Sequence, residues 1–331
     1  MTPIRTVEMH AGGEPVRIVV GGYPPIEGET ILAKRRFARE HLDHLRRLLI
    51  FEPRGHADMY GAILVESDHS EADLAVLFIH NEGYSTMCGH ATIALGRWAI
   101  DSGLVERKEP ETRVAIQVPA GLVRTTVEVA GGHTGRTRFE SVPAFLAATT
   151  EVDVPGFGRV PVDIAYGGAF YAFAPAAAIG LDLKESPVAD LVAGAWAITR
   201  AVAGSEAIEH PDGPDLGFLY GTILTDGADD WSPEPTANIC VFAHRQVDRS
   251  PTGSGVTARI AIQHARGQIA IGQERTFESI VGTQFTGKAL RATTVGEHPA
   301  VIVEVAGQAH YTGEAVFTVE EDDGLEPFLV R

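Results

Sequence analysis

The stretch 87–95, MCGHATIAL, places a cysteine directly before a segment whose apolar residues recur at helical spacing. Apolar side chains at 93, 94, 98 and 99 predict a helix over about Gly89–Ser102 that ends near Gly103. Cys88 then stands at the helix start, where unpaired backbone N–H groups and the positive end of the helix dipole favour the thiolate form. The sequence therefore predicts a reactive thiol at a helix N-terminus.

A related stretch lies in the second half of the chain, where 250–258 reads SPTGSGVTA. It has Thr252 in the position of Cys88, and it predicts a second helix over about Gly253–Ala265 that ends at Gly267. The small residues of this helix suit burial against a sheet on all sides. The two halves therefore differ in the group at the helix start, which is a thiol in the first and a hydroxyl in the second.

The similarity between the halves extends beyond these two stretches. Aligning Cys88 with Thr252 also aligns AVLF at 75–78 with ICVF at 239–242, and, after a small shift, MYGAIL at 59–64 with LYGTIL at 219–224. The order strand, strand, strand, loop, helix thus occurs twice, and an internal repeat constrains the fold more than local propensities do. The repeat predicts an α+β fold of two pseudo-symmetric domains, each a curved sheet or barrel around a central helix.

The repeat also predicts where the domains begin and end. The first is expected to comprise residues 1–143 plus 315–331 and to carry Cys88, and the second residues 144–314, carrying Thr252. Two mirrored halves that face each other would bring two helix N-termini to one cleft, where their N–H groups converge on an anion. A small carboxylate would fit there, between Cys88 and Thr252.

Composition limits the classes of function. The chain has 331 residues, 44% of them hydrophobic, and a formal net charge of −17, so nucleic-acid phosphates would be repelled. No apolar run approaches the roughly 20 residues of a membrane helix. Charged residues interrupt the first twenty positions, which argues against a secretion signal there. Two cysteines make no disulfide framework. We expect a soluble, cytoplasmic protein whose partner is a small molecule, with no nucleic acid and no membrane.

The motifs resemble those of the proline racemase family over essentially the whole chain. They are MCGH at 87–90, DRSPTGSG at 248–255 and PRGHADMYG at 53–61. The resemblance implies the diaminopimelate epimerase-type fold with the active site in the cleft between the domains. In racemases and epimerases of this family both helix starts carry cysteine, and one takes the α-proton while the other returns a proton to the opposite face.

Thr252 departs from that pattern. A cysteine–threonine pair resembles the trans-3-hydroxy-L-proline dehydratases, which yield Δ1-pyrroline-2-carboxylate and water. The resemblance implies that Cys88 is the proton acceptor and that Asp248 pairs with the ring ammonium of the substrate, whereas Thr252 either hydrogen-bonds the substrate or shapes the pocket. It implies that backbone N–H groups hold the carboxylate, those of Gly89, His90, Gly253 and Ser254. No metal and no organic cofactor is needed, and a homodimer is left open.

The stereochemistry of the substrate agrees with a single acting thiol. In trans-3-hydroxy-L-proline the α-hydrogen lies on the same ring face as the 3-hydroxyl, so loss of both is a syn elimination. One side chain on that face could take the proton and then assist departure of the hydroxyl. A threonine hydroxyl has no thiolate-like state near neutral pH, so it cannot share the two-base work of racemisation.

Other functions remain open from the residues alone. A proline racemase or hydroxyproline 2-epimerase is the nearest alternative, and a non-catalytic amino-acid-binding protein is another. His90 could also act as the base of a cysteine hydrolase, or its ring could merely pack. His56 and Asp58 favour a tight loop over a metal pair because no third ligand is evident. Cys240, in an apolar run, is expected in the core, and 253–258, GSGVTA, matches a dinucleotide-binding fingerprint only weakly.

Overall fold

The computed structural model describes residues 2–330, which form a mixed α+β protein made mostly of strands and divided into two compact units. The first unit contains the chain up to 137 and again from 308, and the second contains 138–307. The boundaries expected from the sequence, after 143 and before 315, lie a few residues further along the chain. Strand β8 (His133–Glu140) already crosses the first boundary. Positions 1 and 331 of the expected first domain lie outside the described residues.

The chain returns to the first unit through β18 (Ala309–Phe317), which pairs antiparallel with β1 (Ile4–Ala11). This pairing begins at Ala309, opposite Ala11, and continues to Phe317, opposite Ile4. The returning part of the first domain was expected to begin at residue 315, which lies inside this strand. The return itself happens earlier, because the strand starts directly after Gln308.

The strands of the first unit follow one pairing scheme. Besides β1 they include β2 (Glu14–Gly21), β3 (Tyr60–Val65), β4 (Leu74–His80), β5 (Gly83–Ser85), β6 (Glu111–Val118) and β7 (Gly121–Ala130). Strand β2 is antiparallel to β1 and parallel to β3, β3 is antiparallel to β4, β4 is antiparallel to β5 and parallel to β6, and β6 is antiparallel to β7.

The second unit repeats this scheme. Its strands are β9 (Phe145–Val154), β10 (Gly158–Tyr166), β11 (Phe170–Pro175), β12 (Leu219–Thr225), β13 (Thr236–Phe242), β14 (Gln246–Asp248), β15 (Glu274–Ser279), β16 (Gln284–Val295) and β17 (His298–Gly307). From β10 to β16 the parallel and antiparallel pairings occur in the same order as from β1 to β7. The internal repeat is confirmed at the level of strand pairing.

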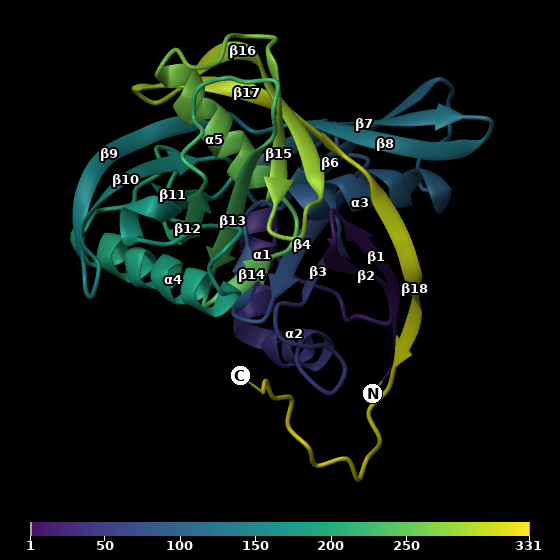
Figure 1. Ribbon diagram of the computed structural model, residues 1–331. Helices are drawn as coiled ribbons and strands as arrows, with labels where there is room; N and C mark the ends of the chain where they lie inside the picture. The colour runs from purple at the N-terminus through teal and green to yellow at the C-terminus, as the bar shows by residue number, and fades with distance from the viewer. Residues whose placement is uncertain (1, 331) are drawn as a thin grey trace. The chain divides into compact units, whose positions relative to one another are not determined.

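Each unit has one buried helix packed against its strands (Figure 1). Helix α3 (Gly89–Asp101) contacts β1, β2, β6, β7 and β18, and α5 (Gly253–Ala265) contacts β9, β10, β11, β16 and β17. Both were predicted, and both are buried on nearly every face because strands surround them. Small residues allow this close packing: a Cβ atom on Gly255 would lie 2.4 Å from Ile223 Cδ1.

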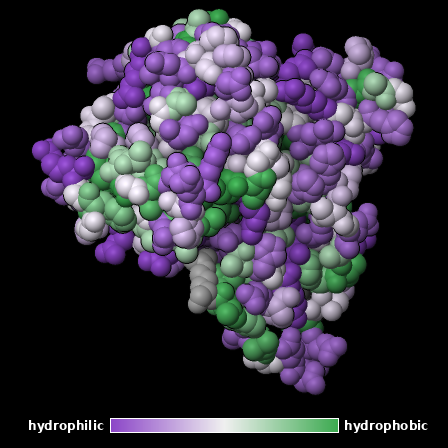
Figure 2. All heavy atoms as spheres, viewed as in Figure 1, coloured by the Kyte–Doolittle hydropathy of each residue, from purple (hydrophilic) through white to green (hydrophobic). Residues whose placement is uncertain are grey.

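Three further helices and one short 3-10 turn were not predicted. They are α1 (Ile31–His41), α2 (Asp43–Ile50), α4 (Val188–Ser205) and the 3-10 turn at Ala176–Ile179. Helices α1 and α2 bury one apolar side with the strands, in a cluster that includes Leu49, Ile50 and Ile79. No helix within residues 2–330 is long and apolar enough to cross a membrane. On the face drawn in Figure 2, hydrophilic side chains predominate and hydrophobic ones form smaller patches.

Candidate active site

Cys88 is the N-cap residue of α3, as the sequence predicts. Its backbone is extended, with φ −147° and ψ 113°, and its sulfur accepts a hydrogen bond of 3.4 Å from the backbone N–H of Ala91. This is the bond that a serine or aspartate makes at a helix start, where the first N–H groups have no partner inside the helix. The sulfur is therefore held in the field of the positive helix end, and the residue is only 4% exposed.

The ring of His90 lies against this sulfur. Its Nδ1 is 3.2 Å and its Nε2 3.6 Å from Cys88 Sγ. Tyr60, on β3, packs edge-on to the His90 ring at a centroid distance of 4.9 Å, and the Tyr60 hydroxyl is hydrogen-bonded to Ser85 Oγ. The sequence predicts that His90 acts through its backbone N–H, and the structure also places its side chain in direct contact with the thiol. An imidazole in this position can take a proton from the thiol or return one.

Thr252 stands at the start of α5, with backbone angles that are unusual for its residue type. Its φ is +66°, in the left-handed region that β-branched residues rarely adopt, and its side chain makes no capping bond. The hydroxyl Oγ1 is buried and has no hydrogen-bond partner within residues 2–330. A buried unpaired hydroxyl costs about 1–3 kcal/mol. Strain and an unpaired polar atom at one residue are typical of functional sites.

The loop before Thr252 is fixed by side chains that bond to the backbone. Asp248, at the end of β14, accepts a hydrogen bond of 2.7 Å from the N–H of Ser250, and Ser250 Oγ accepts one of 3.1 Å from the N–H of Thr252. The amide of Asn238, on β13, donates to the carbonyl of Pro251 at 3.2 Å. Asp248 is 5% exposed, so its carboxyl group is largely shielded from solvent close to the start of α5.

Sequence reasoning missed Tyr171, on β11. Its hydroxyl is 2.8 Å from Oγ of Ser254, the second residue of α5, and both side chains are buried. A single phenol inside the apolar run 169–174, AFYAFA, was the available signal. The turn between β10 and β11 also approaches α5 closely, since a Cβ on Gly167 would lie 2.2 Å from the carbonyl oxygen of Ser254.

The structure therefore brings the predicted site residues together in two groups. Cys88, Gly89 and His90 lie at the start of α3 in the first unit, and Asp248, Thr252, Gly253 and Ser254 at the start of α5 in the second. Cys240 is fully buried on β13, which confirms its place in the core.

His56 and Asp58 form a tight loop. Asp58 has φ +63° and donates its N–H to the side-chain oxygen of Asn81, whose amide donates to the carbonyl of His56. This geometry agrees with the loop interpretation of the PRGHADMYG segment. Within residues 2–330 no group of three or more His, Cys, Asp or Glu side chains is arranged to hold a metal ion.

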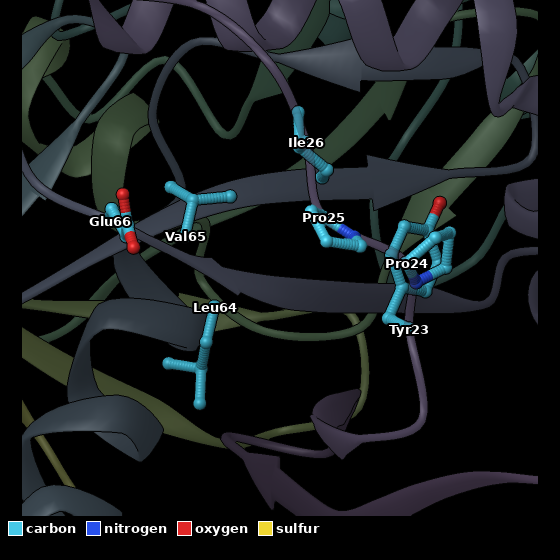
Figure 3. A pocket seen from close by; sticks show the side chains of 7 residues that line it. All are labelled: Tyr23, Pro24, Pro25, Ile26, Leu64, Val65 and Glu66. Carbon is cyan, nitrogen blue, oxygen red and sulfur yellow. The ribbon is translucent and has the colours of Figure 1, made fainter.

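A separate pocket of about 460 Å³ lies in the first unit (Figure 3). The segment Tyr23–Ile26 lines one part of it and Leu64–Glu66, at the end of β3, another. Its lining is largely apolar, with Glu66 as the one charged side chain, and it contains no residue of either helix start. It therefore includes neither Cys88 nor Thr252.

Comparison with known proteins agrees with these motifs. The chain is 59% identical to a Xenopus tropicalis protein named trans-L-3-hydroxyproline dehydratase, over 99% of this chain and 95% of that one. It is 48% identical to a Burkholderia multivorans 3-hydroxyproline 2-epimerase, over 99% of this chain and 98% of that one.

A solved structure shares the fold over the whole length. It is a hydroxyproline epimerase from Agrobacterium vitis with bound trans-4-hydroxy-L-proline, 27% identical, and it matches with a TM-score of 0.93 over 100% of this chain and 95% of that one. The model of the family described as proline racemase matches residues 6–328. The chain belongs to the proline racemase family.

Proposed function

We propose that this protein dehydrates trans-3-hydroxy-L-proline to Δ1-pyrroline-2-carboxylate and water. The observation that carries the proposal is the difference between the two helix starts. Cys88 lies in contact with an imidazole, whereas Thr252 offers only a hydroxyl. The 59% identity to a dehydratase over nearly the whole chain supports the same conclusion.

The reaction begins with removal of the α-proton. The Cys88 thiolate takes this proton, and the electron pair of the C–H bond moves into the carboxylate, which becomes enediolate-like. The pair then forms the double bond between Cα and C3 as the C3–O bond breaks. The leaving hydroxyl receives a proton from the Cys88–His90 pair and departs as water. The resulting enamine tautomerises to the imine, so atoms and charge balance without an oxidant or reductant.

The charge that develops on the carboxylate needs hydrogen-bond donors. We assign this role to the first N–H groups of α3 and α5, which belong to Gly89, His90, Gly253 and Ser254. Removing one comparable donor costs roughly 3–4 kcal/mol of transition-state stabilisation in other enzymes. Asp248 pairs with the ring ammonium.

Thr252 decides which reaction follows proton removal. Without a second thiol, the second helix start has no acid with a pKa close to that of a thiol, so no proton is returned to the opposite ring face. The intermediate therefore proceeds by losing hydroxide from the face on which Cys88 acts. The Thr252 hydroxyl, unpaired within residues 2–330, is available to hydrogen-bond the substrate.

The alternative function is epimerisation, which the 48% identical epimerase relative favours. One assay separates the two. The purified protein is incubated with trans-3-hydroxy-L-proline, with trans-4-hydroxy-L-proline and with L-proline. Formation of an imine that reacts with o-aminobenzaldehyde, from the first substrate alone, is the expected result. Inversion of optical rotation without imine would overturn the dehydratase proposal, and binding of all three without any conversion would indicate a non-catalytic amino-acid-binding protein.

A further inference from the structure

The hydrogen bond between Tyr171 and Ser254 is a buried contact directly at the start of α5. The two oxygens are 2.8 Å apart, and the side chains are 1% and 2% exposed. Tyr171 reaches this point from β11, and Tyr220 of β12 packs edge-on against its ring at 5.8 Å. In the described part of the chain, the hydroxyls of Tyr171 and Ser254 have no hydrogen-bond partner other than each other.

The surroundings of Tyr171 allow its phenol to donate this bond. Burial, with added effects of Cys240 and Tyr220, raises the pKa of the Tyr171 phenol well above its usual value. The phenol therefore keeps its proton at physiological pH and can donate it to Ser254 Oγ. When it does so, the proton of the Ser254 hydroxyl is left free to point elsewhere. The backbone N–H of Ser254, in the first turn of α5, is also without a partner inside the helix.

We infer that Tyr171 is a positioning residue, which holds the Ser254 hydroxyl so that it donates a hydrogen bond to the carboxylate of the substrate. Ser254 thus contributes two donors, its backbone N–H and its hydroxyl. A donor that itself accepts a hydrogen bond is polarised by it, and such chains strengthen each member. The inference rests on the proposed function, because it takes the α5 start to be a carboxylate site.

The matching position in the first unit supports this specialisation. His90 occupies the second place of α3, as Ser254 does in α5, but its ring contacts Cys88. The side chain of the second residue of α3 therefore contacts the thiol, whereas the side chain of the second residue of α5 is hydrogen-bonded to a tyrosine. The side chains at this second helix position therefore differ in role: that of His90 serves proton transfer, and that of Ser254 serves carboxylate binding.

A double-mutant cycle on binding tests the inference. The probe is pyrrole-2-carboxylate, a planar mimic of the deprotonated substrate, and its Kd is measured by calorimetry. We expect Tyr171→Phe and Ser254→Ala each to weaken binding about ten- to a hundredfold, the loss expected for one hydrogen bond to a charged group. The double variant should bind no more weakly than Ser254→Ala alone, because Tyr171 acts only through that hydroxyl. Ser254→Thr, which keeps a hydroxyl, should restore most of the affinity.

A matched control comes from the same unit. Thr222 on β12 and Thr199 on α4 share a buried hydroxyl pair of 2.8 Å, and the Thr199 hydroxyl also donates to the carbonyl of Ala195 on α4. Thr222→Val removes an equivalent bond, so it should lower the melting temperature about as much as Tyr171→Phe while leaving the Kd unchanged.

Each outcome of the cycle has a clear meaning. Unchanged affinity in Tyr171→Phe, or additive losses in the double variant, would overturn the inference, as would failure of the wild-type protein to bind the probe. The imine assay on wild-type protein is independent of this cycle. Imine formation together with a Tyr171→Phe variant that binds normally would remove the positioning role alone and leave the proposed function intact.

Discussion

Cys88 Sγ lies 3.2 Å from Nδ1 of His90, two residues further along the same helix start. The corresponding residues of the second unit, Thr252 and Ser254, share no such contact, since Ser254 is bonded to Tyr171 and the Thr252 hydroxyl has no partner within residues 2–330. Two structurally repeated helix starts therefore carry different chemistry. The first has a thiol with an imidazole to exchange its proton, and the second has none.

Replacing Cys88 by serine should abolish turnover and leave the fold intact. Serine keeps the capping bond to Ala91 that the sulfur makes, but its hydroxyl is far less acidic than a thiol. We expect imine formation to fall at least about 10²-fold, the lower end of what a positioned proton acceptor contributes. The measurement is the initial rate with trans-3-hydroxy-L-proline, with circular dichroism to verify folding.

The other cysteine supplies the control for that experiment. Cys240 is fully buried on β13, so Cys240→Ala removes a thiol without touching either helix start. This variant should keep most of its turnover. If Cys88→Ser remained as active as Cys240→Ala, Cys88 would not be the proton acceptor.

Replacing Thr252 by valine should separate function from stability. Valine has the same β-branched shape at φ +66° and removes a buried hydroxyl that has no partner in the described chain. The free energy of unfolding should therefore be unchanged or rise by up to about 1 kcal/mol, while the KM for substrate rises. Urea unfolding and steady-state kinetics measure the two quantities. A clear loss of stability would mean that the hydroxyl has a structural role.

Replacing Thr252 by cysteine should introduce the missing second thiol. If the threonine alone prevents proton return to the opposite face, the variant will convert some L-proline into D-proline that carries deuterium at the α-carbon. Proton NMR in deuterium oxide follows the exchange, and the wild-type protein is the control. Absence of exchange at high enzyme concentration would show that the surroundings of Thr252, and not only its oxygen, prevent epimerisation.

Replacing His90 by phenylalanine should slow the reaction of Cys88 with alkylating reagents. Phenylalanine keeps the edge-on contact with Tyr60 but cannot exchange a proton with the sulfur. We expect the rate of carboxamidomethylation by iodoacetamide at pH 7 to fall about tenfold or more, because the thiolate is the reacting species. Peptide mass analysis assigns the label to Cys88. An unchanged rate would mean that the helix start alone keeps the thiol reactive.

Low pH should lower the free energy of unfolding of the second unit, because His210 becomes protonated. Burial lowers the pKa of this histidine below 6.5, and His298 lowers it further. The carboxylate of Asp212, at 3.9 Å, partly opposes this shift by raising the pKa. The Nδ1 atom accepts a hydrogen bond from the N–H of Asp212, and the ring packs 4.4 Å from Tyr166, both of which suit the neutral form.

The sign of this effect follows from the two states. The unfolded chain takes up the proton near the ordinary pKa and the folded chain only at lower pH. The contribution of neutral His210 to the free energy of unfolding is therefore complete above about pH 6.5. It is lost as the pH falls through the folded-state pKa of His210. Urea midpoints between pH 7.5 and 5 measure it. His210→Phe, which keeps the ring packing and does not titrate, should show a flatter pH dependence, and an identical slope would exclude His210 as the cause.

The sequence alone predicts much of this molecule because the deciding signals are local. Cys88 and Thr252 precede helices whose bounds follow from apolar spacing and from small residues, and both helices lie where they were expected. The repeat was visible because MYGAIL and LYGTIL occupy equivalent strands, β3 and β12. Helices α1, α2 and α4 escaped prediction because they have no counterpart among the aligned motifs.

Other features depended on contacts between residues distant in the sequence. Tyr171 reaches Ser254 across 83 positions, and no local pattern predicts a hydrogen bond of that span. Likewise, Tyr60 meets the His90 ring only because β3 and α3 pack in one unit. The sequence thus determined which chemical groups stand at the two helix starts. Only the tertiary structure decided that Tyr171 bonds to Ser254 and that the Thr252 hydroxyl has no partner within residues 2–330, because hydrogen bonding and burial depend on packing in space and not on order along the chain.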